Sequence, residues 1–390
     1  MNILVINAGS SSIKYRVYTN QQVFLTGLID GIGESQGSWH HHYGSKHSSI
    51  HHFMSHQQAF DELAKTLQQD LINCPIAGVG HRVVHGGNLL FEPTVINDQV
   101  LQEIDALSNL APIHNPVNVE GIKFARHYFP DALQVAVFDT GFHHQMPPYV
   151  KNYAINQQVA QKYLIQHYGF HGINHEYVAL KAAAFLNKPL NDCHFISLHL
   201  GNGASACLIK NGLSQDTSMG MTPLAGLVMG TRCGDIDPAI PLYLIQMGLP
   251  AAEVDKILNK QSGLMGIAQD NDMRRLLQRA KEGDAAALLA IQTYVYMIQK
   301  TIGAYLSQLQ HLDALIFTGG VGENSAAIRE QILAPLAHFG FSLNSIANQH
   351  NSNDDCRVIS SGEKMVLVIR GDEESLIADK VANLYKQSSV

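Results

Sequence analysis

The sequence contains little cysteine and no long hydrophobic run. Its five cysteines are scattered over 390 residues without a C-x-x-C pair, a pattern typical of reduced thiols rather than of disulfides or a metal site. No apolar stretch approaches the roughly 18 residues that a membrane helix requires. The N-terminus has no basic region, so we expect neither a membrane span nor a signal peptide and predict a cytoplasmic protein.

The chain also lacks an excess of positive charge. Its formal net charge of −7 disfavours nucleic acid as a partner and gives no global attraction for an anionic substrate. The length suffices for two domains, and the 46% of hydrophobic and 15% of charged residues are ordinary for a globular protein. Any phosphate chemistry must therefore depend on local positive charge.

Two stretches of the chain follow the same strand, turn, strand pattern. Residues 3–6 (ILVI) are continuously apolar, which is typical of a buried strand. Residues 7–12 (NAGSSS) are mostly small and polar, and in residues 13–17 apolar and charged residues alternate, which predicts a second strand. Residues 193–212 (CHFISLHLGNGASACLIKNG) repeat the pattern about half a chain length later. Either stretch alone is interpreted as a hairpin. Together they suggest two related α/β domains, each with a turn whose backbone amides can approach phosphate oxygens.

Polar residues follow several of the expected strands. Asn7 and Asp139 come at the ends of apolar runs, and Glu373 lies in the acidic first turn of a helix after residues 365–369 (MVLVI). Acidic residues in a first turn can simply stabilise the helix dipole. Ligand sites in open α/β sheets, however, lie at the carboxyl ends of strands. These oxygen groups therefore predict a site for Mg²⁺ carried by a nucleotide.

Cationic groups occur in glycine-rich loops. Arg82 lies in GVGHRVVHGG, Arg232 in VMGTRCGDIDP and His171 in YGFHGINHEY, while His114 precedes the helix start NPVNVEGI. Each alone is explained as a structural residue. Together they resemble a clamp for phosphoryl oxygens.

Two further segments carry local predictions. The histidine-rich residues 40–56 do not repeat a metal-ligand spacing and are expected to form polar strands at a sheet edge. In residues 314–325 (ALIFTGGVGENS) we expect a strand that opens through three glycines into a helix beginning near Asn324 and Ser325.

Nine motifs distributed from end to end resemble the acetate kinase family, in the family's order. They are NAGSSSIKY, GHRVVHGG, LAPIHNP, VFDTGFHHQMPP, YGFHGINH, HLGNGAS, DTSMGMTPLAGLVMGTRCGDIDP, FTGGVGENS and DEESLIA. The resemblance implies an α/β fold of two duplicated ribonuclease H-like domains of the actin and sugar kinase type, with a nucleotide cleft between them. It places the carboxylate and phosphate side in an N-terminal domain of residues 1–147 plus 374–390. Nucleotide binding and the dimer interface fall in a C-terminal domain of residues 148–373.

The resemblance also implies an activity. An acetate kinase transfers the γ-phosphoryl group of ATP to acetate, reversibly and by direct in-line transfer, and gives acetyl phosphate and ADP. The implied cofactor is Mg²⁺, with Mn²⁺ as the alternative, and the implied assembly is a homodimer that binds neither nucleic acid nor membrane. A propionate or other short-chain carboxylate kinase is the alternative. A superfamily ATPase that acts as a mechanical or regulatory module is a third interpretation.

At the positions that match the family's motifs, the resemblance implies a role for each of the following residues of this chain. The implied catalytic residues are Asp139, Arg82, Arg232 and His171. The implied substrate-binding residues are Arg82, His114, Val84, Ile113, Phe170 and Pro223. The implied nucleotide-binding residues are Lys14, His199, Leu200, Gly201, Asn202, Gly203, Asp272, Met273, Arg274, Gly319, Gly320, Val321, Gly322, Glu323 and Asn324. The implied metal ligands are Asn7 and Glu373, with Glu374 one register step away as the alternative to Glu373. Cys233 departs from the family pattern, in which Ser is common.

Overall fold

The computed structural model describes residues 1–350 and 354–388, without the side chains of residues 45–48. The chain forms two compact units: unit 1 contains residues 1–142 and the segment from Asp372 onward, and unit 2 contains residues 143–371. The chain therefore passes from one unit to the other after Phe142 and again after Gly371. Among the residues described, no helix combines the length and apolarity needed to cross a membrane.

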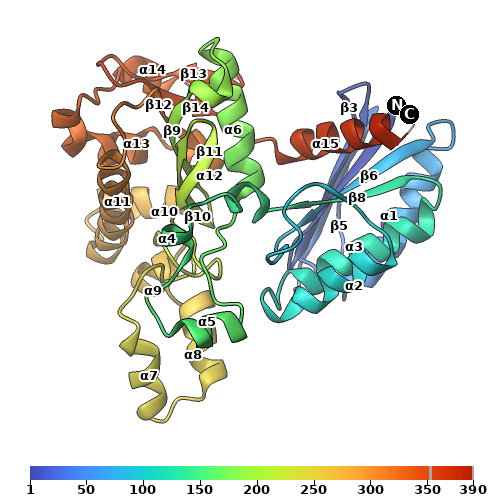
Figure 1. Ribbon diagram of the computed structural model, residues 1–390, viewed down its shortest axis with the longest axis horizontal. Helices are drawn as coiled ribbons and strands as arrows, with labels where there is room; N and C mark the ends of the chain where they lie inside the picture. The colour runs from blue at the N-terminus through green and yellow to red at the C-terminus, as the bar shows by residue number, and fades with distance from the viewer. Residues whose placement is uncertain (351–353, 389–390) are drawn as a thin grey trace. The chain divides into compact units, whose positions relative to one another are not determined.

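Unit 1 is an eight-stranded sheet with helices on both faces (Figure 1). Its strands are β1 (Asn2–Ala8), β2 (Ser12–Thr19), β3 (Gln22–Asp30), β4 (Ser38–Tyr43), β5 (Ser45–Ile50), β6 (Ile76–Val83), β7 (Thr94–Val95) and β8 (Leu133–Phe138). Its helices are α1 (His56–Asp70), α2 (Asp98–Ala106), η1 (Leu107–Asn109), α3 (Asn115–Tyr128) and α15 (Glu373–Ser388), and η2 (Gly141–His143) lies at the first crossing.

Unit 2 contains a six-stranded sheet and most of the helices. Its strands are β9 (His194–Leu200), β10 (Ala204–Lys210), β11 (Leu213–Thr217), β12 (Ala314–Thr318), β13 (Cys356–Val358) and β14 (Val366–Ile369). Its helices are α4 (Pro148–Lys151), α5 (Gln157–Lys162), α6 (Gly172–Phe185), η3 (Leu190–Asp192), α7 (Ala239–Gln246), α8 (Ala251–Lys260), α9 (Gly263–Ala268), α10 (Met273–Lys281), α11 (Ala285–Leu306), α12 (Gly319–Asn324), α13 (Ala326–Leu333), η4 (Ala334–Phe339) and α14 (Ser345–Gln349).

The two sheets share one topology, which confirms the predicted duplication. The order β3-β2-β1-β6-β8 in unit 1 corresponds to β11-β10-β9-β12-β14 in unit 2. In each set the first three strands are antiparallel and the last three are parallel. The hairpin turns also correspond, because the Gly9 amide donates to the Ser12 carbonyl at 2.7 Å and the Gly201 amide donates to the Gly203 carbonyl at 2.9 Å.

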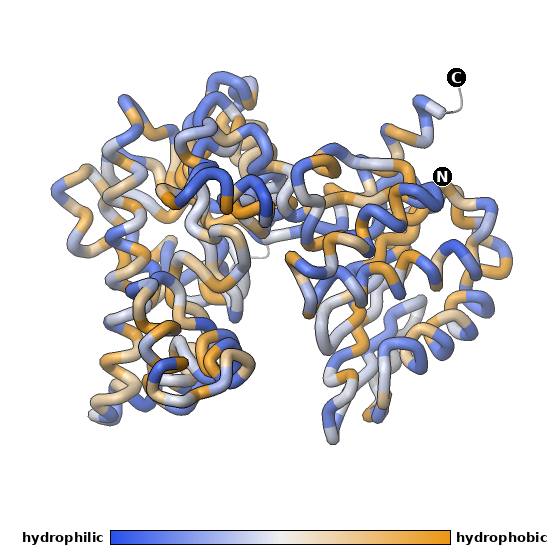
Figure 2. Tube along the Cα trace, turned by 60° about the horizontal axis from the view of Figure 1, so that its bottom comes forward, coloured by the Kyte–Doolittle hydropathy of each residue, from blue (hydrophilic) through white to orange (hydrophobic). Residues whose placement is uncertain are grey.

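Two glycines in β6 allow a helix to lie close against the sheet of unit 1. A Cβ on Gly78 would lie 2.6 Å from Val381, and one on Gly80 would lie 2.5 Å from Ile377, both on α15. Since side chains alternate across a strand, Val79 points to the opposite face, where it joins the core cluster with α1 and α3. Hydrophobic residues concentrate in such buried strands (Figure 2).

The histidine-rich segment forms edge strands, as predicted. Strands β4 and β5 pair antiparallel, and β5 ends the sheet. One of these histidines has a structural role, because the His41 ring bonds Tyr15 Oη at 2.7 Å and Asp70 Oδ2 at 2.8 Å.

The expected helix start near Asn324 and Ser325 is confirmed, because α13 begins at Ala326 with Ser325 as its N-cap, but a short helix that was not expected precedes it. Helix α12 already begins at Gly319, whose φ of 76° lets the chain turn directly from β12. The Glu323 carboxylate accepts the Gly319 amide at 3.0 Å and so closes this first turn. Asn324 is the last residue of α12, and Ser325 alone separates it from α13.

Candidate functional site

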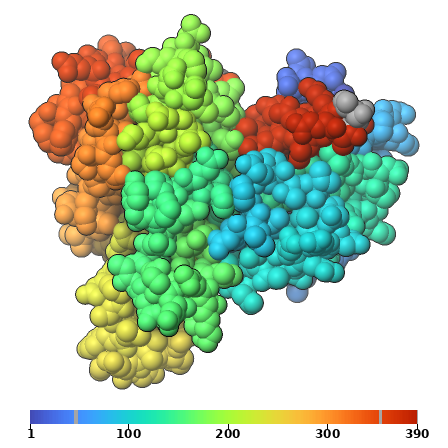
Figure 3. Space-filling view, viewed as in Figure 1, coloured from blue at the N-terminus to red at the C-terminus, as the bar shows by residue number. Residues whose placement is uncertain are grey.

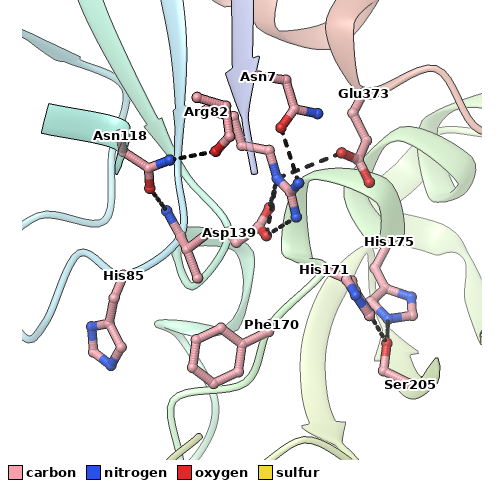
Figure 4. Close-up of polar contacts among 12 residues, drawn as sticks. Asn7, Arg82, His85, Asn118, Asp139, Phe170, His171, His175, Ser205 and Glu373 are labelled. Carbon is pink, nitrogen blue, oxygen red and sulfur yellow. Dashed lines mark hydrogen bonds and ion pairs between the residues drawn. The ribbon is translucent and has the colours of Figure 1, made fainter. Parts of the chain in front are cut away.

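Arg82 is held between Asp139 and Asn7 at the carboxyl ends of three neighbouring strands (Figure 4). Its Nε lies 3.2 Å and 3.1 Å from the two Asp139 oxygens, its Nη2 also donates to Asp139, and its Nη1 donates to Asn7 Oδ1 at 3.1 Å. Burial by itself would lower the pKa of Arg82, but the neighbouring carboxylates of Asp139 and Glu373 raise it above its usual value. The arginine is therefore a fixed cation, and the predicted unit 1 residues do meet.

The two candidate metal carboxylates have opposite electrostatic surroundings. Glu374 is 1% exposed, accepts Lys14 Nζ at 2.8 Å and Asn7 Nδ2 at 3.3 Å, and lies 3.9 Å from Arg16. Burial favours its protonated form, but Lys14 and Arg16 bring its pKa below the usual value. For Glu373, burial raises the pKa to about 7, and the charges of Asp139 and Glu374 add to this although Arg82 opposes it. Glu373 is therefore the carboxylate that still favours an added cation.

The donor set around Glu373 fits a nucleotide-borne Mg²⁺. The described part of the chain contains no group of three or more His, Cys, Asp and Glu side chains arranged as a metal cage. Mg²⁺ usually binds one or two protein carboxylates together with substrate phosphates and water. Glu373 Oε2 lies 3.6 Å from Arg82 Nε. The neighbouring Asn7 side-chain amide accepts a hydrogen bond from Arg82 and donates one to Glu374.

Glu373 reaches this position by a route that the sequence pattern did not indicate. The strand before it, β14, belongs to the sheet of unit 2, whereas Glu373 begins α15 in unit 1. Asp372 caps that helix by accepting the Ser375 amide at 3.3 Å, and it accepts Arg16 Nη1 at 2.6 Å. The ion pairs from β2 therefore fix the start of α15.

The residues expected to line the carboxylate pocket are divided between the units. Val84 is 6% exposed and Ile113 is 44% exposed, both in unit 1 with His114, which begins α3 without a side-chain cap bond. Phe170, 2% exposed, and Pro223 belong to unit 2. Their joint action on one substrate stays a prediction.

A buried asparagine fixes the loop that carries Val84. Asn118 Oδ1 accepts the Val84 amide at 3.0 Å, and its Nδ2 donates to the Ala8 carbonyl at 2.9 Å (Figure 4). Asn115 binds the amide and the carbonyl of the next residue, His85. Sequence reasoning missed both asparagines, although their spacing of three residues at a helix start places them on one helix face.

In unit 2, His171 and Arg232 approach the glycine turn after β9. A Cβ on Gly203 would lie 3.3 Å from His171 Nε2 and 3.8 Å from Arg232 Nη1. Arg232 Nη1 donates to the Pro223 carbonyl at 3.2 Å, and burial lowers the Arg232 pKa. The His171 ring stacks on that of His199 with centroids 4.2 Å apart. Two predicted site residues, His171 and Arg232, thus lie beside the Gly203 backbone, and a third, His199, stacks on His171.

A pocket of about 770 Å³ lies next to that turn, within unit 2. It includes eight of the predicted nucleotide residues: Gly201, Asn202, Asp272, Met273, Arg274, Gly320, Val321 and Asn324. Sequence reasoning missed further lining residues: Leu264, Asn271, Leu277, Gln278, Lys281, Tyr294, Ser325, Ala326 and Ala327. Helical spacing from Met273 would have indicated Leu277 and Lys281, since residues four apart share a helix face.

Other predicted nucleotide residues lie outside that lining. Lys14 is in unit 1, where it pairs with Glu374. Glu323 accepts the amides of Gly319 and Gly371, each at 3.0 Å. The remaining ones are in or near β9 and α12: His199, Leu200, Gly203, Gly319 and Gly322. Their contacts with a nucleotide stay predictions. Cys233 is partly buried, with its thiol directed to the Gly234 carbonyl at 3.2 Å.

Known proteins resemble the chain over nearly its whole length. The model of the Acetokinase family matches residues 2–379. An acetate kinase from Sulfurovum sp. is 43% identical over 384 residues, which cover 96% of each chain. The crystal structure of a propionate kinase from Francisella tularensis has a TM-score of 0.92 at 40% identity, covering 98% of this chain and 99% of that one. An acetate kinase from Porphyromonas gingivalis has a TM-score of 0.89 at 34% identity, covering 98% and 99%.

Proposed function

The chain belongs to the acetokinase family, and from this premise we propose that it transfers the γ-phosphoryl group of ATP to acetate. The products are acetyl phosphate and ADP, and the reaction is reversible. The observation that carries the proposal is the group of Arg82, Asn7 and Glu373, all partly buried, around the buried Asp139. A nucleotide-sized pocket beside a glycine turn in unit 2 supports it.

The chemistry requires charge neutralisation rather than a base. A simple carboxylic acid has a pKa of about 4 to 5 and is ionised at neutral pH, so no group needs to remove a proton. The obstacle is the repulsion between acetate and the nucleotide phosphates. Arg82 binds the acceptor side, and Arg232 and His171 donate to the equatorial oxygens of the transferred group, where the transition state carries charge.

Mg²⁺ is part of the proposal, with Glu373 and Asn7 as its protein ligands and Mn²⁺ as the alternative ion. When bound, it supplies positive charge to the phosphate oxygens of the nucleotide. The raised pKa of Glu373, about 7 because of burial and nearby carboxylates, supports this assignment over Glu374. Transfer is direct and in line, and inversion of configuration at a chiral γ-phosphorus is the expected result. Net retention would contradict it.

The nucleotide occupies the pocket of unit 2. The glycine turn Gly201–Gly203 presents backbone amides to the phosphates, and Asp272 to Arg274 and Gly320 line the nucleoside end. In this proposal residues 1–147 bind the carboxylate substrate, and residues 148–373 bind the nucleotide.

A homodimer formed through unit 2 is proposed from the surface of α7. This helix contains no buried residue: Leu242 and Tyr243 are 61% and 60% exposed, and Met247, directly after the helix, is 64% exposed. The surrounding part of unit 2 is yellow in Figure 3. An exposed apolar helix of this kind requires a covering partner, and a second copy of this chain in the cytoplasm is that partner. Tyr243→Asp is expected to give monomers in sedimentation velocity, whereas an unchanged dimer would exclude α7.

The acceptor is tested by measuring ADP formation with acetate, propionate and butyrate side by side. The 40% identity to a propionate kinase makes propionate the second candidate. We expect kcat/KM to be highest for acetate and to fall by roughly tenfold or more for propionate, because one methylene in a closed apolar pocket changes binding by roughly 1 to 3 kcal/mol. A higher kcat/KM for propionate would transfer the assignment to that substrate.

A further inference from the structure

Three buried side chains, Ser197, His175 and Ser205, form a continuous series of hydrogen bonds that ends on the partly buried His171. His175 Nδ1 lies 2.9 Å from Ser197 Oγ, and His175 Nε2 lies 2.8 Å from Ser205 Oγ. The same Ser205 hydroxyl lies 2.8 Å from His171 Nδ1 (Figure 4). His175, Ser197 and Ser205 are each fully buried, so their hydrogen bonds have no water to replace them.

The backbone at His171 is also held in an uncommon conformation. His171 has φ of 57° and ψ of 21°, in the left-handed region, directly before α6. This conformation is sterically unfavourable for a residue with a Cβ atom. It directs the ring toward Ser205 on one side and toward the Gly203 turn on the other.

Two arrangements of the protons let the buried Ser205 hydroxyl donate to one of its two histidine partners. Burial and the neighbouring rings of His143 and His199 hold the pKa of His175 well below its usual value, so His175 is neutral and has one N–H. If that proton is on Nε2, His175 donates to Ser205, and the Ser205 hydroxyl must donate to His171 Nδ1. If it is on Nδ1, His175 donates to Ser197, Ser205 donates to His175, and His171 Nδ1 must carry a proton itself.

The two arrangements differ at the other nitrogen of His171. In the first, neutral His171 has its proton on Nε2 and can donate. In the second, neutral His171 has a lone pair on Nε2. That nitrogen lies on the side of Gly203 that Arg232 also approaches, where an anion binds in the proposed function. A lone pair would repel the anion, whereas an N–H would stabilise it.

We propose that Ser205 and His175 are positioning residues that fix the His171 tautomer with its proton on Nε2, so that His171 donates to the transferred phosphoryl group. Ser197 supports the chain by donating to His175 Nδ1. The inference rests on the proposed function for its catalytic consequence, but the tautomer itself is measurable without turnover. Of the four hydrogen-bonded side chains His171, Ser205, His175 and Ser197, His171 is the one that donates to the transferred group, and the other three act through it.

The test uses Ser205→Ala in the full-length protein with ¹⁵N-labelled histidine. The nitrogen signals of His171 are identified as those lost in His171→Gln, and spectra are recorded with ADP and inorganic phosphate. We expect Ser205→Ala to reduce the fraction of His171 protonated on Nε2. The variant's kcat should fall about tenfold or more, with less than threefold change in KM for acetate and for ATP.

Three further variants separate positioning from a general loss of structure. Ser205→Thr keeps the hydroxyl and should restore both the nitrogen signals and kcat. Ser197→Ala removes the hydrogen bond to His175 Nδ1 and should shift the His171 signals in the same direction as Ser205→Ala. This variant keeps the proposal testable if Ser205→Ala fails to fold. Ser214→Ala removes an equally buried serine contact, 2.8 Å from His143 Nδ1, and should leave the His171 signals as they are.

Two results would overturn the proposal. One is an unchanged His171 tautomer when Ser205 or Ser197 is replaced, and the other is an equal shift in Ser214→Ala. A wild-type protein that makes no acetyl phosphate would refute the proposed function instead, while the nitrogen spectra would still decide whether Ser205 and His175 set the tautomer.

Discussion

Arg82 and Asp139 form a paired contact at the ends of the neighbouring parallel strands β6 and β8, with Arg82 Nε 3.1 Å from Asp139 Oδ2. Asp139 is 1% exposed. Because Nε and Nη2 both face Asp139, one edge of the guanidinium is occupied and its orientation is fixed. The pair therefore positions a cation in advance of substrate binding.

Replacement of Asp139 by Asn should reduce both stability and activity. It leaves Arg82 in a buried site without its main counter-charge, a change that typically costs about 3 to 5 kcal/mol. We expect a melting temperature lower by several degrees and a kcat lower by at least tenfold. The control is Asp98→Asn. It removes an exposed ion pair, in which Arg126 Nη2 lies 2.7 Å from Asp98 Oδ1 and the Asp98 side chain is 83% exposed. Equal effects of the two substitutions would mean that burial of the pair is irrelevant.

Asn118→Ala should weaken acetate binding. The substitution leaves the buried Val84 amide and Ala8 carbonyl without their partner, and each such group costs about 1 to 3 kcal/mol. We expect the KM for acetate to rise about tenfold while the KM for ATP stays within about twofold. Asn97→Ala removes a helix cap at Val100 and should lower stability by about 1 kcal/mol without changing either KM. An unchanged KM for acetate in Asn118→Ala would show that the loop with Val84 does not affect acetate binding.

Val84→Ala should admit propionate. Val84 is two residues beyond Arg82 and is expected to close the end of the methyl pocket, so its truncation makes room for one methylene. The ratio of kcat/KM for propionate to that for acetate should rise about tenfold. Val83→Ala provides the matched control, because the adjacent Val83 packs in the hydrophobic core of unit 1. That variant should lose stability and keep the wild-type ratio. The pocket assignment fails if both variants give the same ratio.

Much of this arrangement was predictable because strand patterns and turn glycines are local features. The repeat of residues 3–17 in residues 193–212 predicted the duplicated sheets. The polar residues at strand ends predicted that Asn7 and Asp139 lie at one site, where both accept hydrogen bonds from Arg82. The difference in surroundings between Glu373 and Glu374 depends on Lys14, which contacts Glu374 although the two residues are 360 positions apart. The roles of Ser205 and His175 depended likewise on side-chain orientations in three dimensions, for which a sequence period contains no signal.

Acid should destabilise the fold through its buried histidines. Burial lowers the pKa of His81 and of His143 from 6.5 to about 4. The unfolded chain therefore binds protons at these positions below pH 6.5 that the folded chain does not bind until about pH 4. By linkage, the free energy of unfolding should decrease as the pH falls from 6.5 to 4.

Denaturant unfolding at a series of pH values measures this dependence. His81→Gln, at the residue whose Nε2 lies 2.9 Å from Gln134 Oε1, should have a shallower slope between pH 6.5 and 4 than the wild type. The exposed His338 provides the control, since His338→Gln should keep the wild-type slope. Identical slopes for all three proteins would mean that His81 does not contribute.

Formation of acetyl phosphate, followed by ³¹P NMR in a mixture of ATP, Mg²⁺ and acetate, tests the central claim most directly. We predict that acetyl phosphate and ADP appear in equal amounts, and that neither appears when acetate is left out. An ATPase that serves as a mechanical or regulatory module would instead release ADP and inorganic phosphate at a rate independent of acetate, and that result would contradict the assignment.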